Sequence, residues 1–192
     1  MKNNLFVKIF VVFLFCAAFS TGVNAQNMFS KGDNILNVGV GIGSTLGGSG
    51  YSSIIPPLSL SYERGIIDNL FDEKSSLGIG GYIGYASSKD EWFTGSTKYS
   101  WKYNYTIIGA RGVLHYQLVD KLDTYGGLLL GYNIVSSKFD GVIDAGTRKA
   151  AGSDLGWALF IGGRYYFKDN IAAFAELGYG ISYLTVGVSF KF

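Results

Sequence analysis

The sequence predicts an all-β protein, an eight-stranded antiparallel up-and-down barrel that spans a membrane. First, short segments recur in which apolar residues alternate with glycine or polar residues, the period of a strand. Second, charged residues share the glycine face, so the apolar face can point outward to lipid. Third, no apolar run after the N-terminus reaches the ~20 residues of a spanning helix, and Gly126 to Val135 is only about half of that. A chain that spans with strands must close into a barrel to satisfy its backbone.

The N-terminus has the pattern of a secretory signal peptide. Lys2 and Lys8 precede an apolar run through Phe19, and Val23-Asn24-Ala25 gives a small-residue cleavage site. We expect residues 1–25 to be removed after Ala25, leaving residues 26–192 as one barrel domain. An uncleaved membrane anchor is the alternative, and the run is short for one.

Composition excludes several classes. The only cysteine, Cys16, lies in the leader, so the mature chain has no disulfide and no thiolate metal site. The chain has 16 Lys and Arg against 14 Asp and Glu, and the leader holds Lys2 and Lys8, so the mature charge is balanced at 14 each. That balance gives no support to nucleic-acid binding. With 28 glycines, 14 Tyr and 14 Phe, the composition is typical of a sheet-rich exported protein.

The last ten residues give the clearest strand. Its apolar face comprises Leu184, Val186, Val188, Phe190 and Phe192. The intervening residues are small or polar. We therefore expect these five side chains to face lipid in the final strand.

Seven further strands are expected upstream, and the facing of the fifth cannot be assigned because its leucines are consecutive. The expected ranges are Asn34–Gly43, Pro57–Ile66, Ser76–Ser87, Lys102–Leu118, Leu122–Ser136, Leu155–Phe167 and Ile171–Gly180.

Long and short connections alternate along the chain. The long ones are Ser44–Ile55, Lys89–Ser100 and Ser137–Asp154, whereas tight turns fall near Asp120 and Asp169-Asn170. Outer-membrane barrels have long loops outside and short periplasmic turns, which places both termini in the periplasm.

Aromatic residues near the strand ends predict two interfacial belts. The outer belt would contain Trp101, Tyr103 and Tyr105, and the inner one Tyr62, Tyr116, Tyr165, Phe167, Phe190 and Phe192. Trp92 and Phe93, in the second long loop, could contact a partner or rest at the lipid interface.

The predicted interior collects charged residues in its periplasmic half, namely Glu63, Arg111, His115, Arg164, Glu176 and Lys191. Charges out of water must be paired. We expect Arg164 to meet Glu176, and Glu63 to meet Lys191 or Arg111. Eight strands enclose a space just wide enough for side chains, so this charge network should plug the lumen. A proton or ion path is the alternative.

Catalysis and metal binding have little support. His115 is the only histidine, lies near the periplasmic end, and has no serine at close spacing. No His/Cys cluster suggests a transition metal, and Asp140 and Asp144 lack a calcium-loop motif. The glycines of Gly78-Ile79-Gly80-Gly81 precede no helix, so they are better explained by a crowded lumen than by a nucleotide. We expect no cofactor and no catalytic residue.

Several stretches resemble the small outer-membrane β-barrel domain family of OmpA and OmpX. They are Tyr62-Glu63-Arg64-Gly65, Gly163-Arg164-Tyr165-Tyr166-Phe167, Ala175-Glu176-Leu177-Gly178-Tyr179 and the ending Val186 to Phe192. The resemblance implies insertion by the barrel-assembly machinery, which reads the terminal strand. It implies no single activity, because members of this family serve as structural, adhesive or uncharacterised proteins.

The expected function is therefore that of a non-enzymatic outer-membrane barrel of a Gram-negative bacterium, with a plugged lumen and surface loops in a structural or adhesive role. It would contact outer-membrane lipid, act as a monomer, and reach any extracellular partner through its loops. A narrow porin-like channel is the runner-up. An outer-membrane lipid-modifying enzyme and an exported soluble ligand-binding barrel remain as further alternatives.

Overall fold

The computed structural model describes residues 28–44, 52–94, 97–140 and 149–192, and eight strands make up its regular structure. The strands are β1 (Asn34–Ser44), β2 (Ser52–Asp68), β3 (Ser75–Thr94), β4 (Thr97–Val119), β5 (Leu122–Asp140), β6 (Lys149–Lys168), β7 (Ile171–Gly178) and β8 (Ser182–Lys191). The expected signal peptide lies outside the described residues and stays a prediction.

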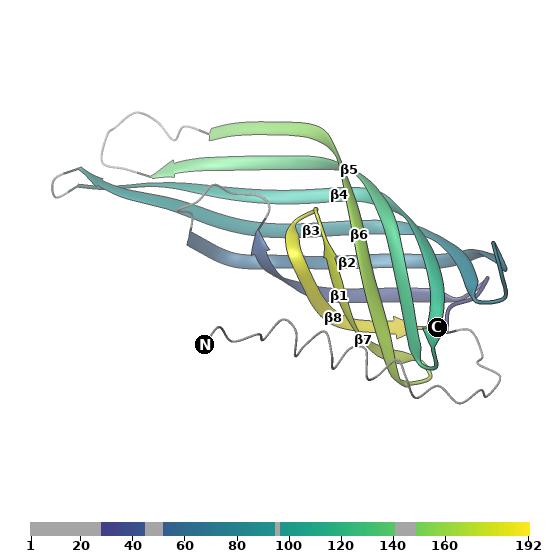
Figure 1. Ribbon diagram of the computed structural model, residues 1–192. Helices are drawn as coiled ribbons and strands as arrows, with labels where there is room; N and C mark the ends of the chain where they lie inside the picture. The colour runs from purple at the N-terminus through teal and green to yellow at the C-terminus, as the bar shows by residue number, and fades with distance from the viewer. Residues whose placement is uncertain (1–27, 45–51, 95–96, 141–148) are drawn as a thin grey trace, which may run out of the picture.

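The strands form one closed barrel in which each pairs with its neighbours in the chain (Figure 1). All the pairings are antiparallel, and β1 closes the ring against β8 with Val38 opposite Val188. Closure removes every sheet edge from the wall. The predicted eight-stranded up-and-down barrel is therefore confirmed.

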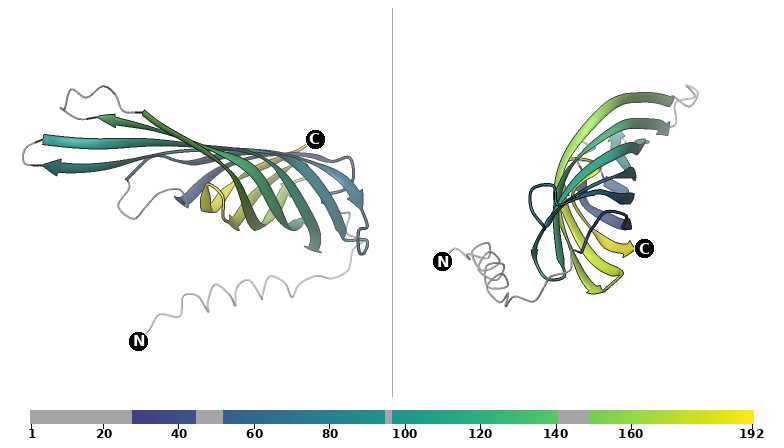
Figure 2. Two further views of the ribbon diagram at one scale, coloured as in Figure 1. Left: turned by 90° about the horizontal axis from the view of Figure 1, so that it is seen from above. Right: turned by 90° about the vertical axis from the view of Figure 1, so that its right-hand side faces the viewer.

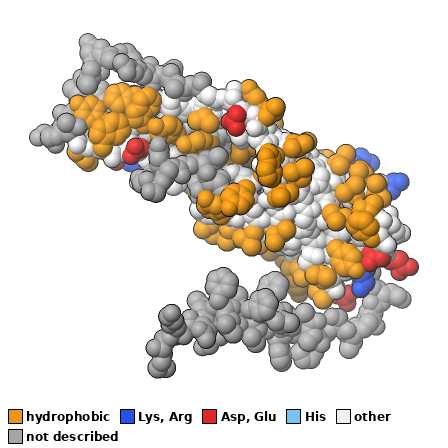
Figure 3. All heavy atoms as spheres, turned by 45° about the horizontal axis from the view of Figure 1, so that its top comes forward, with side chains coloured by type: hydrophobic (Ala, Val, Ile, Leu, Met, Phe, Trp, Pro, Cys, Tyr) orange, Lys and Arg blue, Asp and Glu red, His pale blue; other side chains and the backbone are white. Residues whose placement is uncertain are grey.

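Side chains alternate between a buried lumen and an exposed wall. On β6, Ala158 is 4% exposed and Leu159 58%. The same alternation assigns the facing of β5, which the sequence left open. Leu129 points inward, whereas Leu128 and Leu130 point outward. In Figure 3, hydrophobic side chains spread over the outer wall and charged ones gather at the end with the short turns. The wall has the surface that hydrocarbon requires.

Two of the predicted long loops are mostly strand. Residues 89–94 and 97–100 complete a β3–β4 hairpin, and residues 137–140 and 149–154 extend β5 and β6. The prediction failed because these stretches contain charged residues, as loops commonly do. The alternation of large and polar side chains nevertheless continues through them, which is the pattern of a strand. Figure 2 shows β3 to β6 running well beyond the short β7–β8 hairpin, as a protruding sheet.

The three residues predicted for the outer aromatic belt were wrong. Trp101, Tyr103 and Tyr105 have the same parity on β4 as buried Ile107, so they continue the lumen face and not the lipid face. The six residues of the inner belt are all exposed on the outer wall. Tyr132, Trp157, Tyr179 and Tyr183 are the exposed aromatics toward the opposite end of the wall.

The segment before β1 folds across the short-turn end of the barrel. Gly32 and Asp33 pair with both backbone groups of Gly65 at 3.0 Å. A Cβ on Gly65 would lie 2.1 Å from the Ser30 carbonyl oxygen, so only glycine allows this approach. Phe29 is thereby placed in the lumen, where it is 3% exposed.

No helix long and apolar enough to cross a membrane occurs among the residues that the structure describes.

Candidate functional site

Four charged side chains form a closed ring in the lower lumen, by which we mean the half nearer the short turns. We call this set the charge ring: Glu63, His115, Asp123 and Arg164. Arg164 binds Glu63 at 2.6 Å and Asp123 at 2.9 Å through its two terminal nitrogens. His115 faces Asp123 with Nδ1 at 2.8 Å and Glu63 with Nε2. Both carboxylates are thus shared by the same two cationic partners, and all four side chains are at most 3% exposed.

The geometry fits a doubly protonated His115 between two ionised carboxylates. Ionised carboxylates only accept hydrogen bonds, so each ring nitrogen that faces one must carry a proton. His115 then contributes a positive charge, and the ring holds two cations and two anions. Such balance is what burial of charge in a narrow lumen requires.

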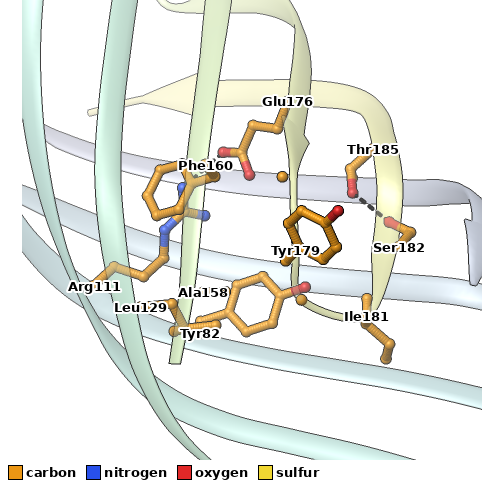
Figure 4. Close-up of a pocket in the computed structure, with 12 residues that line it drawn as sticks. Tyr82, Arg111, Leu129, Ala158, Phe160, Glu176, Tyr179, Ile181, Ser182 and Thr185 are labelled. Carbon is orange, nitrogen blue, oxygen red and sulfur yellow. Dashed lines mark hydrogen bonds and ion pairs between the residues drawn. The ribbon is translucent and has the colours of Figure 1, made fainter. Parts of the chain in front are cut away.

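A second pair lies above the charge ring. Arg111 Nη2 binds Glu176 at 2.7 Å and its Nη1 donates to the Ser61 hydroxyl at 3.2 Å. The Tyr125 hydroxyl donates to the same Glu176 oxygen at 3.0 Å. Figure 4 shows the Arg111 guanidinium beside the Phe160 ring, with its carbon 3.9 Å from the ring centroid.

Aromatic rings seal the layers between and below these charges. Tyr125 lies between the two layers, with its ring centroid 4.4 Å from the Arg164 guanidinium carbon. On the short-turn side, Phe29 stacks on His115 with 3.9 Å between ring centroids. The Phe29 carbonyl accepts a hydrogen bond from Ser76 at 3.1 Å, which fixes the segment that carries it. The lower lumen is therefore filled by side chains and closed at its end.

Five of the six predicted lumenal residues lie in these two layers, but the predicted pairs were wrong. Arg164 takes Glu63 and Asp123 in place of Glu176, which Arg111 binds instead. Stagger between strands explains this, since side chains meet across the barrel and not only along one hairpin.

Lys191 lies apart from the other five. Its Nζ binds Asp33 at 2.8 Å and donates to the Met28 carbonyl at 3.1 Å, at the rim, and its side chain is 25% exposed. It therefore tethers the segment before β1 to the end of β8.

Sequence reasoning missed Asp123 and Phe29. Asp123 opens β5, whose facing could not be assigned, and Phe29 precedes the first strand, where no period exists. The tight turn before Asp123 does fix its parity relative to His115 on β4, because the two strands are joined by Asp120 and Lys121.

The upper lumen keeps a small cavity above Arg111. It measures about 30 Å³, and its lining includes Tyr82, Phe160, Tyr179 and Ile181 (Figure 4). That is room for about one water molecule.

The single histidine of the chain is fully engaged within the charge ring. Both nitrogens of His115 are used by carboxylates, so neither is left to activate a nucleophile. In the same part of the chain no group of three or more His, Cys, Asp or Glu side chains is arranged to hold a metal ion.

The protruding sheet carries a second cluster, which we call the aromatic face: Trp92, Tyr99, Trp101 and Phe139. Trp101 pairs directly with Phe139 across β4 and β5, with 5.2 Å between ring centroids. Trp92 stacks on Tyr99 at 5.9 Å. Figure 3 shows hydrophobic side chains gathered near the far end of the long strands. Phe93 faces the other side of the sheet and is 69% exposed.

Comparison with solved structures identifies the fold. The attachment invasion locus protein Ail of Yersinia pestis, in complex with the heparin analogue sucrose octasulfate, matches with a TM-score of 0.51 at 15% identity, over 84% of this chain and 99% of Ail. The chain has the fold of the small eight-stranded outer-membrane β-barrels. The outer membrane protein OprG of Pseudomonas aeruginosa also matches, with a TM-score of 0.47 at 13% identity over 87% of this chain and 99% of OprG. No protein-family model and no curated protein sequence matches.

This outer-membrane barrel fold accounts for the two surfaces of the molecule. The wall around β6 and β8 is apolar because lipid surrounds it, and the charges lie inside. The fold alone assigns no activity.

Proposed function

We propose that this protein is a non-enzymatic, non-conducting integral outer-membrane barrel that displays its protruding sheet at the cell surface as an adhesive contact element. The observation that carries the proposal is the aromatic face. Trp92, Tyr99, Trp101 and Phe139 lie beyond the end of the short β7–β8 hairpin, on strands that have left the barrel wall. Aromatic side chains provide large, rigid contact area, which is why they are enriched at interfaces.

The partner that suits this face is a saccharide. Flat ring faces stack on the apolar faces of sugars, and neighbouring rings 5.2 to 6.3 Å apart form a surface longer than one sugar ring. Ail, the neighbour with the same fold, was crystallised with a sulfated disaccharide analogue of heparin. That likeness adds support for a surface role, and the aromatic face gives it a location in this chain.

The filled lumen favours this function over a narrow porin-like channel. An ion would have to pass the Arg111–Glu176 pair, the charge ring and Phe29 in turn. The apolar outer wall likewise disfavours an exported soluble barrel, which would leave Leu155 at 85% and Trp157 at 70% exposure in water. A lipid-modifying enzyme has little support at His115. Ser76 lies opposite His115 on β3, but its hydroxyl donates to the Phe29 carbonyl, and both His115 nitrogens face carboxylates.

Biogenesis completes the proposal. The signal peptide would be cleaved after Ala25, and both ends of the barrel would lie in the periplasm, since Asn34 and Phe192 are hydrogen-bonded at the short-turn end. The barrel-assembly machinery would read the face of Leu184, Val186, Val188, Phe190 and Phe192. All of these except half-buried Leu184 are exposed on the wall of β8. We expect the inserted protein to be a monomer.

A glycan array tests the surface role. Purified, folded protein is applied in detergent as wild type, as the double variant Trp92→Ala/Trp101→Ala, and as the matched control Trp157→Ala. Trp157 is a lipid-facing tryptophan on β6. We expect the wild type to bind saccharide and the double variant to lose at least tenfold in affinity. The control should bind as tightly as the wild type. Binding that survives the double substitution, or no binding by wild type, contradicts the proposal.

A further inference from the structure

The face of the protruding sheet opposite the aromatic face carries a row of lysines. Lys89 on β3 pairs with Lys102 on β4, and Lys102 pairs in turn with Lys138 on β5. The backbone register continues from Lys138 to Lys149 on β6. Residues directly opposite one another in a sheet share a face, so the first three side chains stand side by side. We call Lys89, Lys102 and Lys138 the lysine row.

Such a row is costly for the folded sheet. Like charges placed directly opposite destabilise a strand pair, and lysine is disfavoured in strands to begin with. In the described part of the chain, Lys89 alone among the three lysines has a carboxylate partner, Glu91 at 2.9 Å. Within the described residues, Lys102 and Lys138 have no ion-pair partner, although both are exposed. The strand register places Glu91 and Asp140 on the same face one row further out, so three cationic positions stand beside two anionic ones, on a chain whose mature charge is otherwise balanced.

The position of the row indicates what compensates it. Ile134 on β5 is an outward-facing apolar side chain, 41% exposed, and Lys138 follows it four residues along the same strand. At about 3.4 Å per residue and a tilt near 40°, the row lies roughly 10 Å above the last apolar side chain of that strand. That height is in the headgroup layer of the outer leaflet, and lysine side chains extend along the surface to reach charged groups there.

We propose that the lysine row binds phosphate groups on the saccharide headgroup of the outer-leaflet glycolipid, and so fixes the depth and tilt of the protruding sheet. Adjacent strands are about 4.8 Å apart, so the three ammonium groups span about 10 Å, a distance that a headgroup with more than one phosphate can bridge. The row lies on the face that continues the lipid-facing wall, and this favours a component of the same membrane over a polyanion from another cell. The inference rests on the barrel being in an outer membrane, and not on saccharide binding by the aromatic face.

The test measures binding of purified phosphorylated lipopolysaccharide and of its dephosphorylated form to the folded protein in detergent. The variants are Lys102→Gln/Lys138→Gln and the matched control Lys121→Gln/Lys168→Gln, whose lysines are exposed at the short-turn end. Heat-modifiable gel mobility is recorded for each, so a failure to fold is separated from a failure to bind.

Each lysine near an anionic surface contributes roughly fivefold in affinity, so we expect the double variant to bind phosphorylated glycolipid about 25-fold more weakly than wild type. Dephosphorylated glycolipid should bind weakly to all variants, and the control should match wild type. Equal binding of both glycolipids, or equal binding by the double variant, overturns the proposal. So does a preference of the row for free heparin over glycolipid, which would indicate a polyanion from outside.

Discussion

At the scale of single residues, this protein depends on how charges are shared inside a narrow lumen. In the charge ring each carboxylate meets both Arg164 and His115, so removing one member leaves two others short of a partner. Composition and strand period predicted that Glu63, Arg111, Arg164 and Glu176 would lie inside. They could not predict the pairing, because partners across a barrel depend on the stagger of all the strands between them.

Arg164→Met tests the charge ring. Loss of the guanidinium leaves Glu63 and Asp123 with only His115 between them, and uncompensated buried charge costs about 3–5 kcal/mol. The free energy of unfolding, measured by urea titration in lipid vesicles, should fall by that amount. Arg64→Met, at an exposed arginine on β2, is the matched control and should change it little. Equal effects of the two substitutions would mean that Arg164 is not buried in a network.

Two adjacent glycines on β3 test which face of the strand is crowded and which is open. A Cβ on Gly80 would lie 1.9 Å from the Tyr62 carbonyl oxygen, whereas a Cβ on Gly81 meets nothing closer than 4.0 Å. Gly80→Ala should therefore lower the free energy of unfolding by about 1–3 kcal/mol through overpacking, and Gly81→Ala should not. Urea unfolding of both variants compares them. If Gly81→Ala were the more damaging of the two, the assigned facing of β3 would be wrong.

At the scale of elements, the period of two was the most informative signal. It located all eight strands, including β7 and β8 nearly to their ends, because one wall faces lipid and the other a filled lumen. It failed to extend β3 to β6, since beyond the membrane neither face is purely apolar and the charges resemble a loop. The prediction of Trp101 at the lipid interface came instead from its position near a strand end, although its parity matches that of Arg111.

Val188→Arg tests the lipid-facing wall of β8. Val188 is 39% exposed and lies between Val38 and Ala173 of the neighbouring strands. Arginine there should destabilise the barrel by about 2–4 kcal/mol in lipid vesicles. The same new charge at Phe71, exposed in the β2–β3 turn, should have little effect. A Val188→Arg barrel as stable as wild type would place this face in water.

Deletion of Phe192 tests the terminal strand as an assembly signal. Phe192 is 70% exposed, and its backbone pairs with Asn34 at the point where β8 meets β1. We expect a several-fold fall in the amount of folded protein in outer-membrane fractions, scored by heat-modifiable gel mobility. Phe71→Ala, which removes an exposed ring outside the barrel wall, serves as the control. Normal amounts of the deletion variant would show that the machinery does not need this residue.

At the scale of the whole molecule, the two ends of the barrel differ in structure. The half with the short turns is closed by the segment that carries Phe29, by the charge ring and by the Arg111–Glu176 pair. The opposite end extends β3 to β6 into a protruding sheet (Figure 2). By the strand register, the aromatic face lies on one side of that sheet and the lysine row on the other. Sequence could predict the barrel from local pattern. The closing segment and the two-faced sheet required the register, because each joins residues from different strands.

Single-channel recording in planar bilayers tests the central claim that this is a membrane barrel with a filled lumen. Wild-type protein, shown to be folded by its gel mobility before boiling, should insert and give no steady conductance steps. Steady, reproducible steps from the folded wild-type protein would contradict the account, in which side chains from Phe29 to Arg111 block the lumen.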